Sequence, residues 1–379
     1  MTEWKRVRLG DVISINPRIS LGKGVRAKKI QMEALTPGRR DIYSCIQESY
    51  SGGTKFRNGA TLMARITPCL ENGKIAQVRF LEENEVAFGS TEFIVLEGVD
   101  GLTDPNFVYY LASTNYIKQK AVDSMVGSSG RQRAQPDEIA KIEISLPPLA
   151  IQRKIAAVLG AIDDKIETNR KICANLEAQA QALFKSWFVD FEPFGGKMPK
   201  DWKMGELGNI VSPKRGKVIT KASAVAGTVP VIAAGIEPAY FTDKHNVEGP
   251  AITISASGAN AGYISLRYEN IWASDCSYVS QRETPYIYFF YNLLKSKAEI
   301  VRQMQKGTAQ AHVHVSDLER LEITVPDEGA IKQYNDIVSS FYGAIGICTN
   351  QSRSLASMRD ALLPRLMSGE IDVEKVEVA

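Results

Sequence analysis

Positively charged side chains gather in two glycine-containing stretches of the sequence. The first stretch is RISLGKGVRAKK (18–29) and the second is PKRGKVITK (213–221), and each follows a segment that begins with tryptophan. Lysine and arginine on a glycine-containing loop can approach phosphate groups closely, which is the chemistry of nucleic-acid binding. A run of charge is usually only a solvated surface, so the recurrence of the pattern is what favours binding.

Other basic and amide side chains lie on loops that also occur twice. Arg65 and Lys74 flank an expected hairpin, and the Gly-Ser loop 127–130 is matched by KGTAQAHVH (306–314). Arginine, glutamine and asparagine on such loops are able to read base edges as well as phosphates. The candidate nucleic-acid-binding residues are Arg18, Lys23, Arg26, Lys28, Lys29, Arg65, Lys74, Arg131, Arg133, Lys214, Arg215, Lys217, Lys221, Lys306, Gln310 and His312.

The sequence contains no motif that predicts catalysis. The Gly-Lys pairs at 73–74, 196–197 and 216–217 lack the upstream glycine and the following Ser or Thr of a phosphate-binding loop. No Asn/Asp-Pro-Pro-aromatic motif of an adenine methyltransferase is present, since Asn16-Pro17 continues into Arg18. His312 and His314, with only His245 elsewhere, are too few for a dedicated metal site. We therefore expect no catalytic residues, no metal and no cofactor.

The composition sets loose bounds on the class of protein. A hydrophobic content of 44% and a charged content of 23% in 379 residues predict an ordinary folded chain with two or more domains. The net charge of +3 permits nucleic-acid binding without arguing for it. No apolar run reaches the ~18 residues of a membrane span, and the start is no signal peptide, so a cytoplasmic protein is expected. The five cysteines are scattered and never spaced CxxC, which favours reduced thiols.

The segments that must position these loops occur in two copies. WKRVRLGDVISI, from Trp4, is echoed by WKMGELGNIVS, from Trp202. AKIEISLPPLAIQRKI (140–155) is similarly echoed by RLEITVPDEGAIKQY (320–334). A period this long indicates duplication of a whole domain rather than a solenoid repeat.

A long helix is expected after each globular block. Apolar residues recur at steps of three and four from Ile151 to Phe188 and again from Ile331 to Leu366. Pro364 is expected to kink or end the second helix. The second block starts where the first helix ends and finishes where the second helix starts, so these two helix ends must lie close together. The helices are therefore expected to form an antiparallel hairpin. Roughly 36 residues would give a rod of about 54 Å.

Two features of the helices leave alternatives open. Asn169 and Asn350 occupy matching places, in IETN and ICTN, where they could fix the register of a coiled coil or simply face solvent. The aromatic end of the first helix, LFKSWFVDFEPF (183–194), either packs against the second block or docks another protein, and both can hold.

The globular blocks are predicted to be strand-rich. Alternating apolar and β-branched residues at 59–80, 86–96, 249–266 and 271–279 indicate strands, with short helices near 105–119 and 285–297. The expected fold class is α+β: two mixed, strand-rich domains joined by two long helices in an antiparallel coiled coil, with an internal pseudo-two-fold repeat. The expected boundaries are 1–150, 151–195, 196–328 and 329–379.

Five strings of the sequence cover both halves of the chain in order: ARITPCLENGKIA (64–76), FGSTEFIVL (88–96), GSSGRQRAQPDEIAKIEISLPPLAIQRKIA (127–156), LEAQAQALFKSWFVDFEP (176–193) and LLPRLMSGEI (362–371). On these strings, the whole chain resembles the specificity subunit of type I restriction–modification systems.

The resemblance implies a non-catalytic subunit whose two target-recognition domains each read one half of a bipartite site in double-stranded DNA. It implies that the helices set the spacing and dock two adenine methyltransferase subunits and the restriction and translocase subunits, with no role for a membrane. The second domain departs further from the family pattern, so carry-over of individual residues is weaker there.

Two functions of other classes compete with this interpretation. One is an enzyme with a buried nucleophile that motifs do not reveal, which would transfer methyl groups without a partner. The other is an adaptor whose two blocks bind polypeptides, which would not show sequence-selective, salt-dependent binding to duplex DNA.

Overall fold

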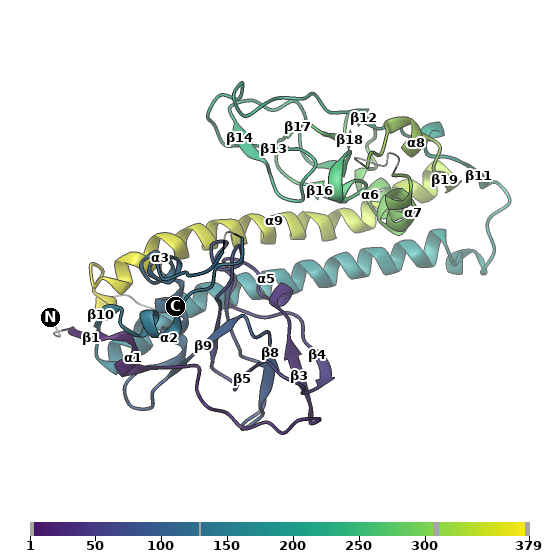
Figure 1. The fold of residues 1–379 in the computed structure, drawn as a ribbon. Coiled ribbons are helices and arrows are strands. Elements are labelled where there is room, and N and C mark those ends of the chain that lie inside the picture. The colour runs from purple at the N-terminus through teal and green to yellow at the C-terminus, as the bar shows by residue number, and fades with distance from the viewer. Residues whose placement is uncertain (1–3, 129, 306–310, 376–379) are drawn as a thin grey trace. The chain divides into compact units, whose positions relative to one another are not determined.

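The computed structural model describes residues 4–128, 130–305 and 311–375 (Figure 1). The chain divides into two units, each with its own hydrophobic core. Unit 1 comprises residues 1–169 and 351–379, and unit 2 comprises residues 170–350.

A four-stranded antiparallel sheet lies at the centre of each unit. In unit 1 the strand order is β2 (Ile13–Ile15), β9 (Phe93–Gly98), β6 (Thr61–Ala64) and β7 (Ile75–Gln77). In unit 2 it is β12 (Lys214–Arg215), β18 (Cys276–Ser280), β15 (Ala251–Ser255) and β16 (Ile264–Arg267). All residues of β6 and β15 are buried, which explains their continuous apolar and β-branched composition.

A second sheet in each unit contains one parallel pair. In unit 1 the order is β4 (Ile46–Ser49), β3 (Arg26–Ile30), β8 (Ala87–Gly89) and β5 (Thr54–Phe56), with β3 and β8 parallel. In unit 2 the order is β14 (Tyr240–Thr242), β13 (Val229–Ile232) and β17 (Trp272–Ala273), with β13 and β17 parallel. The duplicated topology confirms the internal repeat.

The tryptophan-led segments form matching two-stranded ribbons. In unit 1, β1 (Lys5–Arg8) pairs with β10 (Glu143–Leu146), and in unit 2, β11 (Lys203–Glu206) pairs with β19 (Glu322–Val325). Arg6 lies opposite Ser145, and Met204 lies opposite Thr324.

Short helices also match between the units. Unit 1 has α1 (Leu9–Val12), α2 (Pro105–Ser113), α3 (Asn115–Asp123) and α4 (Pro136–Ala140), with the 3-10 turns η1 (Met32–Ala34) and η5 (Val373–Lys375). Unit 2 has α6 (Ile287–Ser296), α7 (Ala298–Gln303) and α8 (Val315–Glu319), with η2 (Glu192–Phe194), η3 (Leu207–Asn209) and η4 (Gly258–Asn260).

The helix expected over 105–119 is two helices that meet at Thr114. The Thr114 hydroxyl accepts a hydrogen bond from the backbone N–H of Ile117, and so caps the start of α3. The helix expected near 285–297 is α6.

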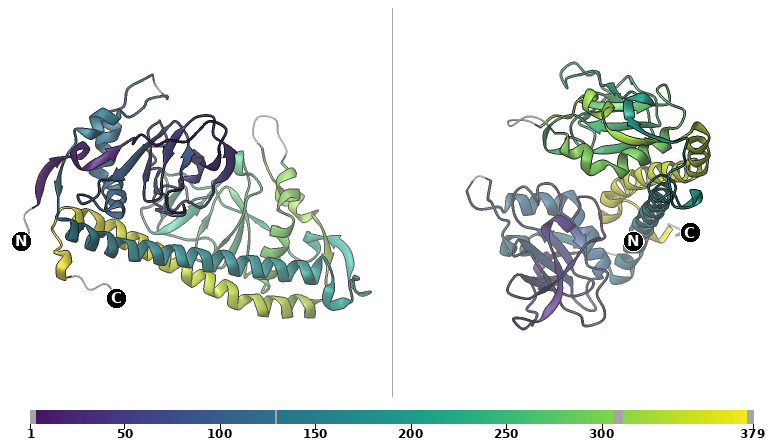
Figure 2. Two further views of the ribbon diagram at one scale, coloured as in Figure 1. Left: turned by 90° about the horizontal axis from the view of Figure 1, so that it is seen from below. Right: turned by 90° about the vertical axis from the view of Figure 1, so that its right-hand side faces the viewer.

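The long helices α5 (Leu149–Phe188) and α9 (Glu328–Met367) are each 40 residues long and run through both units (Figure 2). In unit 1, Asp163 of α5 pairs with Arg359 of α9 at 2.8 Å. In unit 2, the Tyr334 hydroxyl of α9 donates to the Ala180 carbonyl of α5 at 2.9 Å. Partner numbers fall along α9 as they rise along α5, so the antiparallel pairing is confirmed.

Two details of the long helices decide what the sequence left open. Asn169 is 1% exposed and donates to Gln351 at 2.9 Å and to Ser352 at 3.3 Å, so it lies at the seam, whereas Asn350 is exposed. Pro364 does not end α9, which continues to Met367.

The aromatic end of α5 packs inside unit 2. Phe184 and Phe188 are 2% and 5% exposed, and the Phe188 ring contacts Phe289 and Trp202. Among the described residues, no helix is both long and apolar enough to cross a membrane.

Candidate nucleic-acid interface

Three loops of unit 1 are joined by backbone hydrogen bonds at the end of β6. The N–H of Arg65 donates to the carbonyl of Glu92 at 2.9 Å, and the N–H of Ala134 donates to the carbonyl of Arg65 at 2.8 Å. The N–H of Thr67 donates to the carbonyl of Gln132 at 3.1 Å. The structure therefore brings Arg65 together with the loop that carries Arg131 and Arg133. We call this group, Arg65–Thr67 with Glu92 and Arg131–Ala134, the unit 1 junction.

Arg133 is held by a carboxylate at this junction. Its Nε lies 3.0 Å from each carboxylate oxygen of Glu92, and its Nη2 lies 2.8 Å from Oε1. The hydrogen bonds and the charge of Glu92 raise the pKa of the Arg133 guanidinium. The side chain remains 44% exposed, so the guanidinium is fixed in place and still accessible.

Arg65 and Arg131 differ in exposure. Arg131 is exposed, whereas Arg65 is half-buried, and its Nε has no hydrogen-bond partner among the residues that the structure describes.

Unit 2 repeats the junction with the same backbone bonds. The N–H of Val313 donates to the carbonyl of Ala256 at 2.9 Å, and the N–H of Gly258 donates to the carbonyl of Ala311 at 3.0 Å. These bonds correspond to those of Ala134 and Thr67 in unit 1. Ser257 forms a β-bridge with His312, as Ile66 does with Arg133. We call Ala256–Gly258, Asp275 and Ala311–Val313 the unit 2 junction.

Different side chains occupy the unit 2 junction. Asp275 accepts hydrogen bonds from the guanidinium of Arg215 and from the hydroxyl of Ser257. His312 and His314 have their rings 6.1 Å apart and nearly parallel. Arg215 thus has a carboxylate partner, as Arg133 has. Arg215 lies on β12, however, whereas Arg133 lies on the junction loop.

The basic stretch 18–29 contains two classes of side chain. Arg18, Lys23 and Arg26 are exposed and have no carboxylate partner within the described part of the chain. Lys28 instead pairs with Glu85 at 2.9 Å, and Lys29 pairs with Glu48 at 2.8 Å. A hydrogen bond from the backbone N–H of Glu82 and the bond from Lys28 lower the pKa of Glu85. Lys28 and Lys29 are therefore paired with carboxylates and only 23% and 29% exposed, less than the 44% of Arg133.

Lys74 also has a structural contact. Its ammonium donates to the carbonyl of Met32 at 3.0 Å, and the side chain is half-buried. In unit 2, Lys214, Lys217 and Lys221 are exposed. The two remaining candidates, Lys306 and Gln310, lie outside the described residues.

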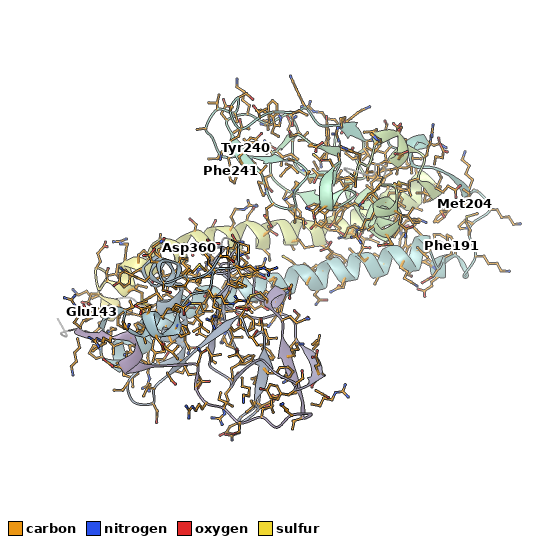
Figure 3. All side chains as sticks on the ribbon, in the orientation of Figure 1. Glu143, Phe191, Met204, Tyr240, Phe241 and Asp360 are labelled. Carbon is orange, nitrogen blue, oxygen red and sulfur yellow. The ribbon has the colours of Figure 1, made fainter. Side chains whose placement is uncertain are left out.

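Sequence reasoning missed an aromatic pair beside the basic stretch of unit 2. Tyr240 and Phe241 lie on β14, and Phe241 is 54% exposed (Figure 3). The Tyr240 hydroxyl donates to the carbonyl of Ile219 at 2.6 Å, which ties this strand to the stretch that carries Lys217 and Lys221. Exposed rings beside basic residues can stack on bases or sugars. The three residues YFT of this strand did not by themselves predict this contact.

The arrangement is suited to binding phosphates and base edges. In the described part of the chain, no group of three or more His, Cys, Asp or Glu side chains is placed to hold a metal ion. Each junction offers hydrogen-bond donors on rigid loops, which is what contact with phosphates and base edges requires.

The comparisons with known proteins agree on one family. The family described as "Type I restriction modification DNA specificity domain" matches residues 1–178 and 199–355. The chain is 27% identical over 313 residues to the type I restriction enzyme MjaIX specificity subunit of Methanocaldococcus jannaschii, covering 73% of this chain and 71% of the relative. It is 24% identical over 414 residues to the HindI specificity subunit of Haemophilus influenzae, covering 83% and 87%.

A solved structure shares the fold. The S subunit of a type I restriction–modification system from M. genitalium superimposes with a TM-score of 0.62 at 17% identity, covering 96% of each chain.

Proposed function

The chain belongs to the type I restriction–modification DNA specificity family, and from that premise we propose that each of its two units reads one half of a bipartite DNA site. The unit 1 and unit 2 junctions and the basic stretches 18–29 and 213–221 are the contact surfaces of this proposal.

The observation that carries the proposal is the duplicated junction. Both junctions use the same backbone hydrogen bonds, but they present Arg65, Arg131 and Arg133 beside Glu92 in unit 1, and Ser257 and His312 beside Asp275 in unit 2. A shared scaffold with different donors and acceptors supports two half-sites of different sequence, because base edges are distinguished by their donor and acceptor patterns.

Catalysis is assigned to other subunits. The relatives are named specificity subunits, and we place methyl transfer to adenine in two methyltransferase subunits and cleavage in restriction and translocase subunits. The complex would act on DNA in the cytoplasm, with this chain supplying the sequence information.

The helices are assigned the spacing and docking roles. In this proposal, residues 1–150 and 196–328 are the two target-recognition domains, and 151–195 and 329–379 are the helical regions. Buried contacts of Asp163 and Asn169 within unit 1, and of Tyr334 within unit 2, hold α5 against α9 and support these roles.

The test is binding and methylation by the purified chain with and without its methyltransferase. We expect the complex to bind particular duplexes with a steep dependence on salt concentration, and the chain alone to transfer no methyl groups from S-adenosylmethionine. Methylation by the chain alone would overturn the division of labour. Equal affinity for all duplexes would overturn the recognition role.

A further inference from the structure

Each unit contains a hollow at the end of a long helix, and the two hollows occupy equivalent places. In unit 1 the hollow lies among α2, β10 and the last turns of α9, with a volume of about 720 Å³. In unit 2 it lies among α6, β19 and the last turns of α5, with a volume of about 280 Å³.

The lining positions match by their places in the elements. Met367 and Phe188 are the last residues of α9 and α5, and Leu363 and Phe184 lie one turn earlier. Ser145 of β10 and Thr324 of β19 hold the same place in their ribbons, opposite Arg6 and Met204. Because the two hollows are formed by equivalent elements, their difference in volume reflects the different side chains that line them.

In unit 2 the hollow is smaller and is lined by aromatic side chains of the chain itself. The rings of Phe184 and Phe188 lie 5.1 Å apart, and Phe188 also contacts Phe289 at 5.1 Å. The segment that follows α5 then covers the site with Phe191 and Met198 (Figure 3 labels Phe191).

In unit 1 the equivalent positions carry smaller or more flexible side chains. Leu363 and Met367 replace the two phenylalanines. After α9, Ser368 lines the hollow, but Ile371 and Val373 turn into the core of unit 1 and do not cover it. The described residues thus supply no counterpart to Phe191 or Met198.

The lining of the unit 1 hollow combines apolar walls with polar side chains, among them Ser113 and Arg359. Tyr109, Tyr110 and Ile144 form buried walls. Glu143 and Asp360, both labelled in Figure 3, are exposed at the rim. A volume of about 720 Å³ lies within the ~300–1,000 Å³ of sites that enclose a ligand, whereas about 280 Å³ falls below it.

We propose that the unit 1 hollow is a docking site for a segment of a partner polypeptide that carries large aromatic side chains. The occupant is inferred from unit 2, where phenylalanines of the chain itself narrow and cover the equivalent hollow. Aromatic rings bury large apolar areas and pack well against tyrosines, such as those of α2. This interaction is separate from DNA recognition and does not depend on the junction residues.

The test uses the full chain and a synthetic peptide with the sequence of residues 183–194, LFKSWFVDFEPF, which closes the hollow of unit 2. We expect saturable binding by calorimetry or fluorescence. The variant Met367→Phe gives unit 1 the ring that Phe188 supplies in unit 2, and Ser113→Leu enlarges another side chain that lines the hollow. Each should weaken binding at least about tenfold. Asp100→Phe, which adds a ring at an exposed position that does not line the hollow, is the matched control and should bind normally.

Three outcomes would overturn the docking site. The peptide could fail to bind, or it could bind both filled variants as tightly as the original chain while their melting curves remain native. It could also bind only after residues 376–379 are removed, which would make the chain's own terminus the occupant. Sequence-selective DNA binding, measured in parallel, should be unchanged in the filled variants, so failure here leaves the recognition proposal standing.

Discussion

At the scale of single residues, each unit fixes one arginine with a carboxylate near its junction. Arg133 is braced by Glu92 and Arg215 by Asp275, and both guanidinium groups stay accessible, at 44% and 45% exposure. A braced guanidinium loses less rotational freedom when it contacts DNA, and its planar set of donors suits guanine or a phosphate. These arginines are therefore stronger candidates for base contact than the exposed lysines of the basic stretches.

Replacing Arg133 with lysine should weaken recognition of one half-site. Lysine keeps the charge but loses the bidentate geometry, so we expect the affinity for the preferred duplex to fall roughly ten- to a hundredfold. Competition binding between the preferred duplex and single-base variants measures this. Lys141→Ala, which removes an exposed lysine paired with Glu138, is the control. An unchanged preference at every base would remove Arg133 from the recognition set.

The lysines and arginines of 18–29 should separate into two functional classes. Charge reversal at Lys23 and Arg26 should lower affinity for all duplexes and reduce the salt slope by about 0.9 for each phosphate that is no longer neutralised. Lys28→Gln and Lys29→Gln should instead lower the free energy of unfolding by about 0.2–1 kcal/mol, because these lysines pair with Glu85 and Glu48. Salt titrations of DNA binding by all four variants, together with their denaturant unfolding, test this division into two classes. A larger change in the salt slope at Lys28 than at Lys23 would contradict it.

At the scale of elements, the pairing of α5 with α9 in unit 1 contains a buried ion pair. Asp163 is 4% exposed and Arg359 is 8% exposed, and Asp163 also accepts from the Tyr110 hydroxyl at 2.7 Å. Arg359 further donates to the carbonyl of Gly38 at 2.8 Å. The pair therefore connects both helices to α2 and to the loop before β4.

Removing one partner of this pair should be costly. Arg359→Met leaves the Asp163 carboxylate buried without its cation, so a loss of about 3–5 kcal/mol in the free energy of unfolding is expected. The double variant Asp163→Asn, Arg359→Met should recover much of that loss, because no buried charge remains. Denaturant unfolding of the two variants measures the difference, and equal losses would show that the charge is not the cause.

The start of α9 gives a prediction for pH dependence. Asp327 accepts from the N–H of Ala330 at 2.9 Å and from the indole of Trp202 at 2.8 Å. These bonds lower the pKa of Asp327, the backbone bond most. Because the folded pKa is below the unfolded one, this stabilisation is present above the unfolded value and is lost as pH falls through the folded value.

Asp327→Asn keeps an acceptor at the helix start and should cost little at neutral pH. Asp327→Ala removes the cap and should cost about 1 kcal/mol. The stability advantage of the original chain over Asp327→Ala should shrink on acidification, measured by unfolding from neutral to acidic pH. If the stability advantage grew on acidification, the pKa of Asp327 would be raised on folding and not lowered, which would contradict this prediction.

The repeated segments made the elements predictable but not the contacts between them. The helical periodicity and the tryptophan-led echoes indicated α5, α9 and the matching ribbons, because these signals are local. The bracing of Arg133 by Glu92 spans 41 residues and that of Arg215 by Asp275 spans 60, so no spacing rule could reveal either. The break at Thr114 depended on a capping bond that competed with a continuous helical pattern.

At the scale of the whole molecule, one topology is used twice with separate surfaces. Strand order, ribbons and junction bonds repeat, while the side chains at the junctions and in the hollows differ. Such a chain can change what one unit recognises without changing the other, since their cores are separate. The central claim is that each unit specifies one half-site.

The most direct test is selection from random duplexes by the complex of this chain with its methyltransferase. The original chain should select two defined segments separated by an unspecified spacer. Arg133→Ala should relax only one segment, and a double variant Arg215→Ala, His312→Ala should relax only the other. A single contiguous segment, or relaxation of the same segment by both variants, would contradict the assignment of one half-site to each unit.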